Sequence, residues 1–254
     1  MKNQIPSFQS ISELLRALGL PKTVHPLIAL VDYQDISVET EDLGKGYGGY
    51  TLLFHPDFIR NYPLGKNMAK YGFFSYSVAE ALYLSDKEKK VIFSLFDAIA
   101  IELDNSIDQF SQDVLVSQIE TLLNYSSRFY NRQFITRKVI HNDLIINMES
   151  YLTAFFDGEE ALLNGLPSVQ QVADHLNVSQ RYLSDMLRAL TGQTTQQYIQ
   201  AKLIEKAKDL LSRSNLTTAE IAYQLGFGYP QSFNKLFKSK TKLSPLEYRQ
   251  TFNN

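Results

Sequence analysis

The sequence predicts a mainly α-helical protein with a C-terminal seven-helix domain and an N-terminal helical region that includes a small β portion. Apolar residues recur at helical spacing through most of residues 73–157 and again from residue 168 onward. Two C-terminal segments, 168–188 and 217–238, both have the pattern of a helix, a tight turn and a second helix. The 254 residues are 44% hydrophobic, enough for two domains, which we assign to residues 1–160 and 161–254.

The first of the two units begins at a reciprocal capping box. Ser168 can cap a helix, and Gln171 three residues later can reach back to its backbone N–H. Asn177 suits the turn because asparagine tolerates a left-handed backbone, and Ser179 can cap the second helix. That helix turns its apolar side inward and leaves a polar set outside: Gln180, Arg181, Ser184, Asp185 and Arg188.

The second unit repeats this arrangement. Thr217 and Glu220 form its capping box, and Gly226 ends its first helix, where glycine adopts a positive φ at little cost. Ala173 and Ala222 hold equivalent positions in the two units, where a small side chain lets two helices approach closely. The second helix leaves amides, hydroxyls and amines outside: Gln231, Ser232, Asn234, Lys235 and Lys238.

The segment between the units predicts a connecting helix over about residues 195–212, beginning at a capping box of Thr194 and Gln197. Its roughly 18 residues would span about 27 Å at about 1.5 Å per residue. That length is near the roughly 34 Å between successive major-groove faces on one side of a DNA duplex. The two units and their spacer therefore predict a tandem helix–turn–helix domain, whereas one unit alone could equally be an ordinary helical hairpin.

Charge is distributed unevenly along the chain. Residues 1–165 hold 14 Lys and Arg against 21 Asp and Glu, a net charge of −7, whereas residues 166–254 hold 11 against 6, a net charge of +5. A positive excess on the C-terminal part suits the phosphate backbone of DNA. The polar side chains on the two second helices are of the kinds that contact base edges and phosphates.

At these residues the chain resembles the AraC/XylS family of bacterial transcription regulators. The tracts that carry the resemblance, within about residues 166–252, are GQTTQQYI (192–199), LIEKAKDLL (203–211), AYQLGF (222–227), QSFNKLFK (231–238) and LSPLEYR (243–249). The resemblance implies a sequence-specific regulator whose monomer reads two adjacent major-groove segments of double-stranded DNA. It assigns base contacts to the positions held here by Gln180, Arg181, Ser184 and Asp185, and by Pro230, Gln231, Asn234 and Lys235.

Three positions depart from residues common in the family. Asp185 stands where a basic or amide side chain is frequent, and its carboxylate could accept a hydrogen bond only from a cytosine amino group. Pro230 cannot donate a backbone hydrogen bond and suits the first position of the helix. Lys242 stands where the family usually has glycine, so we expect strain in that turn. These differences bear on the operator sequence more than on DNA binding itself.

The family's N-terminal sensor is typically a small cupin-like β-barrel that binds an effector and is followed by dimerising helices. Within about residues 24–56 the strand candidates are few: 27–31, 36–40 and 50–54. A closed barrel needs several more strands, so we expect an incomplete one and leave open whether a small-molecule effector binds. We expect the helices of about residues 73–157 to pair two monomers into a homodimer, with simple packing inside one chain as the alternative.

Several other classes of protein are disfavoured by composition. The chain has no cysteine, and its four histidines are scattered without ligand-like spacing, so we expect no metal, no cofactor and no catalytic residues. It shows neither a secretory signal nor an apolar run near the roughly 20 residues that cross a bilayer, so we expect a cytoplasmic protein without membrane contact.

We therefore expect a DNA-binding transcription regulator, not an enzyme, that acts next to RNA polymerase. One alternative is a degraded regulator that keeps DNA binding or dimerisation without an effector response. A less favoured alternative is a cupin-type enzyme with a DNA-binding tail.

Overall fold

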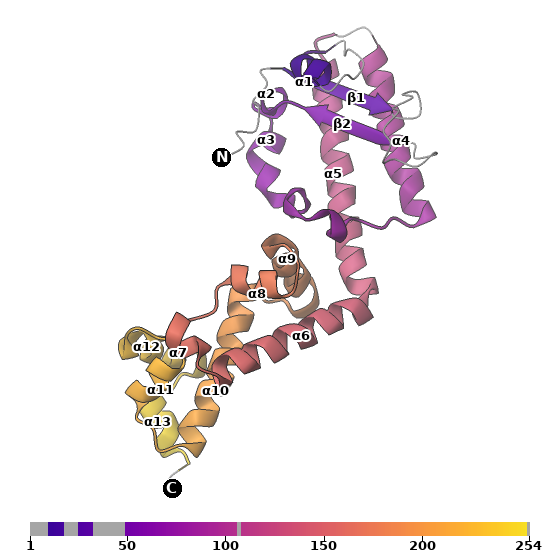
Figure 1. Cartoon of the computed structure of the whole chain (residues 1–254). Coiled ribbons are helices and arrows are strands. Elements are labelled where there is room, and N and C mark those ends of the chain that lie inside the picture. The colour runs from indigo at the N-terminus through magenta and orange to yellow at the C-terminus, as the bar shows by residue number, and fades with distance from the viewer. Residues whose placement is uncertain (1–9, 18–24, 33–48, 106–107, 253–254) are drawn as a thin grey trace. The chain divides into compact units, whose positions relative to one another are not determined.

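The structure is a computed structural model that describes residues 10–17, 25–32, 49–105 and 108–252 (Figure 1). It divides into two compact units. Unit 1 comprises residues 1–71 and 82–129, and unit 2 comprises Gly72–Ala81 and Tyr130–Asn254. The chain thus passes from unit 1 to unit 2 and back before entering unit 2 for good within helix α5 (Ser111–Thr136). This division differs from the boundary that we placed between residues 160 and 161.

Unit 1 contains the small β portion. Strand β1 (Ile28–Asp32) pairs antiparallel with β2 (Tyr50–Phe54), with Ile28 opposite Phe54 and Asp32 opposite Tyr50. These are two of the three predicted strands, and the third candidate, 36–40, lies outside the described residues. A small apolar cluster lies between the sheet and helix α1 (Ile11–Ala17), formed by Ile11, Leu15, Ala29, Val31 and Leu53.

The helices of unit 1 lie next to this sheet (Figure 1). Two short helices, α2 (Pro56–Ile59) and α3 (Pro63–Asn67), follow β2 and lead into the 3₁₀ turn η1 (Met68–Lys70). Helix α4 (Asp86–Asp104) begins at a complete capping box of Ser85 and Glu88. The ring of Tyr50 stacks on that of Phe96 with 5.2 Å between centroids, so an aromatic contact joins the sheet to α4.

Residues 73–85 do not form the α-helical segment that their apolar spacing predicts. They contain two short 3₁₀ turns, η2 (Gly72–Ser75) and η3 (Val78–Glu80), and no regular structure from Ala81 to Leu84. Val78, expected on an apolar helix face, is 95% exposed. The local reason is that Ser77 and Glu80 close a capping box on a single turn, and Ser85 then starts a new helix.

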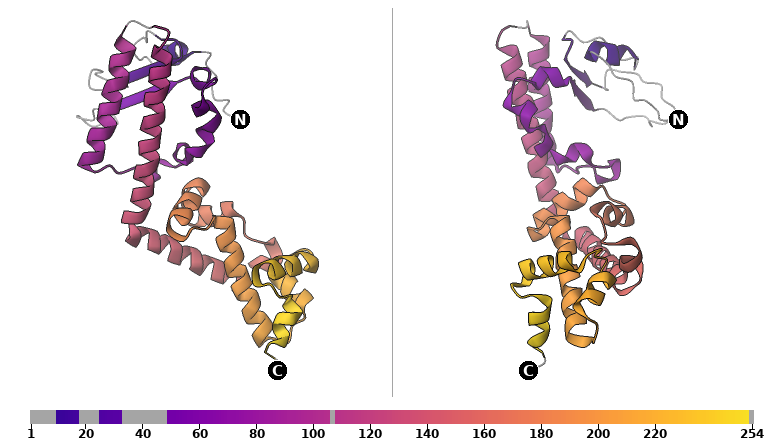
Figure 2. Two further views of the ribbon diagram at one scale, coloured as in Figure 1. Left: turned by 180° about the vertical axis from the view of Figure 1, so that it is seen from behind. Right: turned by 90° about the vertical axis from the view of Figure 1, so that its left-hand side faces the viewer.

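Unit 2 contains α6 (Lys138–Asp157) and the seven helices predicted for the C-terminal domain. These are α7 (Glu160–Asn164), α8 (Val169–His175), α9 (Gln180–Thr191), α10 (Thr195–Arg213), α11 (Thr218–Gln224), α12 (Pro230–Thr241) and α13 (Pro245–Gln250). Figure 2 shows α8 and α9 grouped at one end of the long helix α10, and α11, α12 and α13 at its other end. The predicted mainly helical fold class is confirmed.

The two helix–turn–helix units repeat one backbone design. In the first, Asn177 has a φ of 55° and the N–H of Val178 donates to the carbonyl of Ala173 at 3.0 Å. In the second, Gly226 has a φ of 89°, and the N–H of Phe227 donates to the carbonyl of Ala222 at 2.9 Å. Both alanines are fully buried, as expected for the close crossing of two helices.

The second turn tolerates only glycine. A Cβ atom at Gly226 would lie 2.7 Å from the carbonyl carbon of Gly165 and 2.8 Å from the carbonyl oxygen of Ala161. Those distances are well inside van der Waals contact, so the backbone of α7 packs directly on the backbone of this turn. Asn177 meets no such constraint, and its side chain is exposed.

A buried histidine of α6 forms a hydrogen bond with α9 on its inner side. His141 is 1% exposed, with Nδ1 2.8 Å from the carbonyl oxygen of Phe134 and Nε2 3.1 Å from the hydroxyl of Tyr182. Because a carbonyl only accepts, Nδ1 carries the proton and Nε2 of the neutral ring accepts from the Tyr182 hydroxyl. Burial lowers the pKa of His141, the hydrogen bond to Phe134 opposes that effect, and the charge of Arg137 adds to it.

The stability of the protein should therefore fall in mild acid. The folded pKa of His141 lies below the value of about 6.5 that an unfolded chain adopts, so the unfolded state binds more protons as the pH falls from about 7.5 to about 5.5. Urea unfolding followed by circular dichroism should show this loss. His141→Asn keeps an N–H donor for Phe134 and should flatten the pH dependence, and equal slopes for the two proteins would contradict this assignment.

Lys242 follows α12 with a φ of 69°, the left-handed conformation that we expected to strain this turn. Lys242→Gly should raise the free energy of unfolding by about 1 kcal/mol, because glycine adopts this conformation without a Cβ penalty. Lys240→Gly, two residues earlier and inside the helix, is the matched control and should lower it by up to about 1 kcal/mol. Urea unfolding of both variants checks the opposite signs, and a loss of stability in both would refute the strain at Lys242.

Candidate nucleic-acid interface

Helix α12 presents an open polar face. Its inner side is anchored by Phe233 and Phe237, which are fully buried and have ring centroids 5.7 Å apart. Pro230 occupies the first turn, as predicted. The polar side chains predicted to face outward are all exposed: Gln231, Ser232, Asn234, Lys235 and Lys238. This face offers amide, hydroxyl and ammonium groups together, which can bond to base edges and to phosphates.

Tyr229 belongs to the same surface but was not among the predicted residues. It is the N-cap residue of α12, its side chain is 74% exposed, and its carbonyl accepts from the N–H of Ser232 at 3.0 Å. A large aromatic side chain outside the apolar period, directly before a helix-starting proline, was the signal in the sequence. Its hydroxyl could donate to a phosphate next to the helix start.

Helix α9 presents a different face, because its polar side chains are already engaged. Gln180 and Arg188 are exposed, whereas Arg181, Ser184 and Asp185 are half-buried. The guanidinium Nε of Arg181 lies 2.9 Å from Oδ2 of Asp185, four residues later on the same helix. The hydroxyl of Ser184 lies 3.0 Å from that of the buried Thr195 at the start of α10.

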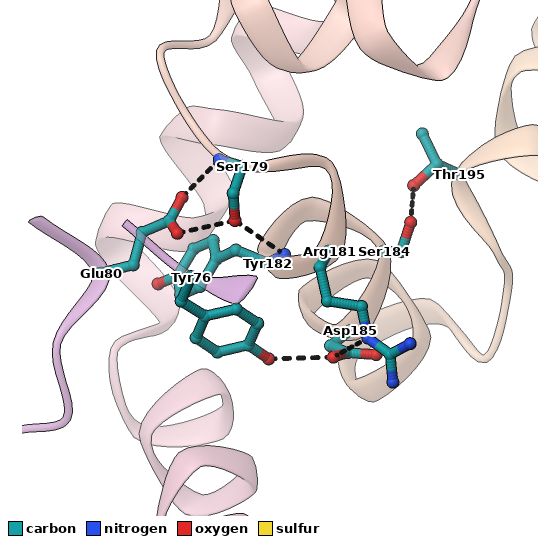
Figure 3. A network of polar contacts seen from close by, with 8 residues as sticks. All are labelled: Tyr76, Glu80, Ser179, Arg181, Tyr182, Ser184, Asp185 and Thr195. Atoms are coloured by element: carbon teal, nitrogen blue, oxygen red, sulfur yellow. Dashed lines mark hydrogen bonds and ion pairs between the residues drawn. The ribbon is translucent and has the colours of Figure 1, made fainter. Parts of the chain in front are cut away.

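Two side chains from the segment Gly72–Ala81 form hydrogen bonds with α9 and its N-cap residue, and neither has a signal in the local sequence (Figure 3). The hydroxyl of Tyr76 donates to Oδ2 of Asp185 at 3.0 Å. Both carboxylate oxygens of Glu80 accept from Ser179, Oε1 from its backbone N–H at 2.6 Å and Oε2 from its hydroxyl at 2.7 Å. Burial and the charge of Asp185 raise the pKa of Tyr76, so its hydroxyl keeps its proton and remains a donor.

Helix α10 connects the two helix–turn–helix units and sets the distance between them. It contains 19 residues, which corresponds to about 28 Å. One side of it is buried along its length, at Ile199, Leu203, Ile204, Ala207 and Leu211. Its outer side is tied to α6, since Glu149 accepts from the hydroxyl of Tyr198 at 2.6 Å and lies 3.2 Å from Nζ of Lys202.

The described residues contain no group of three or more His, Asp or Glu side chains arranged to hold a metal ion. Across the same residues, no helix combines the length and apolar character required to cross a membrane.

A family model described as a helix-turn-helix domain matches residues 172–251. The chain is 30% identical over 141 residues to the HTH-type transcriptional activator RhaS of Salmonella schwarzengrund, covering 55% of this chain and 46% of that protein. It is 26% identical over 147 residues to the uncharacterized HTH-type transcriptional regulator YfiF of Bacillus subtilis, covering 58% of this chain and 43% of that protein. The chain therefore spans less than half the length of each of these two relatives.

Among solved structures, the chain is similar to the C-terminal domain of AraT, a response regulator from Geobacillus stearothermophilus. The identity is 29%, the TM-score is 0.37, and the match covers 42% of this chain and 84% of that chain. Two helix–turn–helix units on one connecting helix, matched by a helix-turn-helix family model over residues 172–251, identify the C-terminal part of this chain as a tandem helix–turn–helix domain.

Proposed function

We propose that this protein is a sequence-specific transcription regulator whose monomer lays α9 and α12 into adjacent major-groove segments of double-stranded DNA. The observation that carries the proposal is the repeated turn geometry of the two helix–turn–helix units, which pack on the buried side of a single helix, α10. The relatives named as transcriptional regulators favour this function over a cupin-type enzyme with a DNA-binding tail, and give no support for catalysis.

The side chains of α12 divide into two roles. Gln231, Asn234 and Lys235 lie on the first two turns and are exposed, so they would reach base edges. Ser232 and Lys238 would bond to phosphates and set the position of the helix in the groove. On α9 the corresponding side chains would also bond to base edges or to phosphates. They are Gln180, Arg181, Ser184, Asp185 and Arg188.

The assembly of the regulator belongs to the same proposal. A homodimer would form through the helices of unit 1, which expose large apolar side chains at Phe93 and Ile101 on α4 and Val114 on α5. Bound to DNA, the dimer would lie next to RNA polymerase, and access to the chromosome would place it in the cytoplasm. Whether unit 1 binds a small-molecule effector is left open. The alternative function is a regulator that binds DNA or dimerises without an effector response.

The first test is selection of bound sequences from a random duplex library with the full-length protein at a stated salt concentration. We expect an enriched motif of two blocks about one helical turn apart, since α10 sets the spacing of α9 and α12. Binding that depends on salt but enriches no motif would contradict a sequence-specific role.

Single alanine substitutions on α12 should separate the two kinds of contact. Lys238→Ala should weaken binding to the selected duplex and to a scrambled duplex alike, and should lower the slope of log K against log salt by about 1. Asn234→Ala should instead relax the preference at particular base pairs, by about 1–3 kcal/mol. Affinity titrations on both duplexes at several salt concentrations give these quantities.

Lys87→Ala is the matched control for charge, because it removes an exposed cation from α4 in unit 1. It should leave the salt slope and the base preference unchanged. Equal losses on both duplexes for Lys238→Ala and Asn234→Ala would show that the proposed base-reading role of Asn234 is wrong.

A further inference from the structure

The segment Gly72–Ala81, which we call the cover segment, packs against the N-terminal half of α9 (Figure 3). It contacts the helix at three places. Glu80 binds the N-cap residue Ser179, and Tyr76 binds Asp185. The backbone of Gly72 lies so close to Arg181 and Asp185 that a Cβ atom there would overlap both side chains.

These contacts fall on the side chains that α9 would use to read DNA. Arg181 and Asp185 are two of the four positions assigned to base contacts, and their side chains are only 41% and 22% exposed. The equivalent residues of α12, Gln231 and Lys235, are exposed. The two helix–turn–helix units share their turn geometry. The lower exposure of Arg181 and Asp185 therefore comes from the cover segment and from the ion pair that it contacts.

Glu80 places a carboxylate at the N-terminus of α9, where a helix entering DNA would hold a phosphate. The N-terminus of a helix carries unpaired N–H groups and a partial positive charge, and it favours an anion. At a helix that enters the major groove, that anion is commonly a backbone phosphate of the duplex. Here the anion is the Glu80 carboxylate, 6% exposed, which accepts from the backbone N–H and the hydroxyl of Ser179.

Besides the contacts at α9, few groups hold the cover segment, among them the amide of Gln133, which donates to the carbonyl of Ala81 at 3.3 Å. Its release would therefore leave the core of unit 2 closed. Phe73 and Tyr76 contact the ring of Tyr130 with centroid distances of 5.5 and 5.1 Å, and Tyr76 also contacts Tyr182 at 5.2 Å. Most of the remainder is exposed, including Phe74 at 58% and Val78 at 95%. Its secondary structure consists of two 3₁₀ turns, without a longer helix or a strand ladder.

We propose that the cover segment is an intramolecular inhibitor that imitates DNA on α9 and must leave before α9 enters the groove. The proposal rests on the DNA-binding function proposed above. Both ends of the segment continue into unit 1, at Tyr71 and Leu82. An event in unit 1 that pulls on either end would shift the balance between covered and free α9, and duplex DNA would shift it by competing for the same groups.

Removing the contacts should strengthen DNA binding. Glu80→Gln removes the phosphate-like charge and Tyr76→Phe removes the hydrogen bond to Asp185, so each should bind the selected duplex roughly five- to twentyfold more tightly than the wild-type chain. Lys238→Ala, added to either variant, should still weaken binding. Titrations of the full-length proteins at one salt concentration measure both effects.

Two control variants separate this effect from general changes in charge or hydrophobicity. Asp143→Asn removes one exposed negative charge from α6, and Val78→Ser changes a residue of the cover segment that is 95% exposed. Both should leave the affinity unchanged. An equal gain for Asp143→Asn and Glu80→Gln would overturn the proposal, because the gain would then be an effect of net charge.

Hydrogen exchange on the wild-type chain gives a readout that does not depend on the folding of a variant. Adding the selected duplex should speed exchange at Ser77, Glu80 and Ala81, whose N–H groups are bonded within the cover segment. Unchanged or slower exchange there, together with unchanged affinity of Glu80→Gln and Tyr76→Phe, overturns the inhibitor while leaving DNA binding intact. Absence of duplex binding by every one of these proteins overturns the proposed function as well.

Discussion

The buried side of α10 determines the geometry of the C-terminal domain. Leu203 and Ala207 near the middle of the helix have almost no exposed surface, and Ile199 and Leu211 extend the same buried side toward its ends. Truncation of a leucine in such a position typically costs about 2–5 kcal/mol, part of which is the cavity left behind. Each helix–turn–helix unit is too small to bury its own apolar side, so both depend on this one helix for a core. The spacing of α9 and α12 follows from the same packing and is therefore as rigid as the core itself.

Helices α9 and α12 follow turns of the same backbone design and differ in what lies over them. On α12 the amide and ammonium groups face solvent, and a duplex would have to displace only water. On α9 an arginine is already paired with an aspartate, a serine with a threonine, and the helix N-terminus with a carboxylate. A duplex must therefore exchange protein contacts for DNA contacts at α9, and the free energy of the lost contacts is subtracted from the affinity. The chain would reach DNA first through the second helix–turn–helix unit, whose polar face on α12 is open.

The sequence predicted those features that are encoded within a few residues. The capping boxes at Ser168, Thr194 and Thr217 have both halves formed, because two residues three apart suffice to specify them. The left-handed turn at Asn177 was predicted from the tolerance of asparagine for this backbone, and the strain at Lys242 was expected from the glycine that the resembled family has there. Two of the three strand candidates were located correctly, and the third, 36–40, lies outside the described part of the chain.

The contacts that cover α9 could not be predicted, because they join residues about one hundred positions apart in the chain, from Glu80 to Ser179 and from Tyr76 to Asp185. The apolar spacing of residues 73–85 predicted a helix there, and the few polar side chains with partners on α9 were hidden within that pattern. The pairing of Arg181 with Asp185 was visible as a spacing of four residues. Because the helical pattern places Arg181 and Asp185 on the outer side of α9, the sequence predicted that both could contact DNA.

Because unit 2 combines two separate stretches of the chain, a C-terminal fragment does not contain all of it. Unit 2 takes one short stretch from before α4 and the rest from the last residues of α5 onward. A fragment that starts at residue 161, the domain boundary expected from the sequence, lacks Tyr76 and Glu80. It therefore lacks the only carboxylate that the structure places on the N-cap of α9 within the described residues. Such a fragment and the intact chain are different molecules at this helix, and a DNA affinity measured on the one does not transfer to the other.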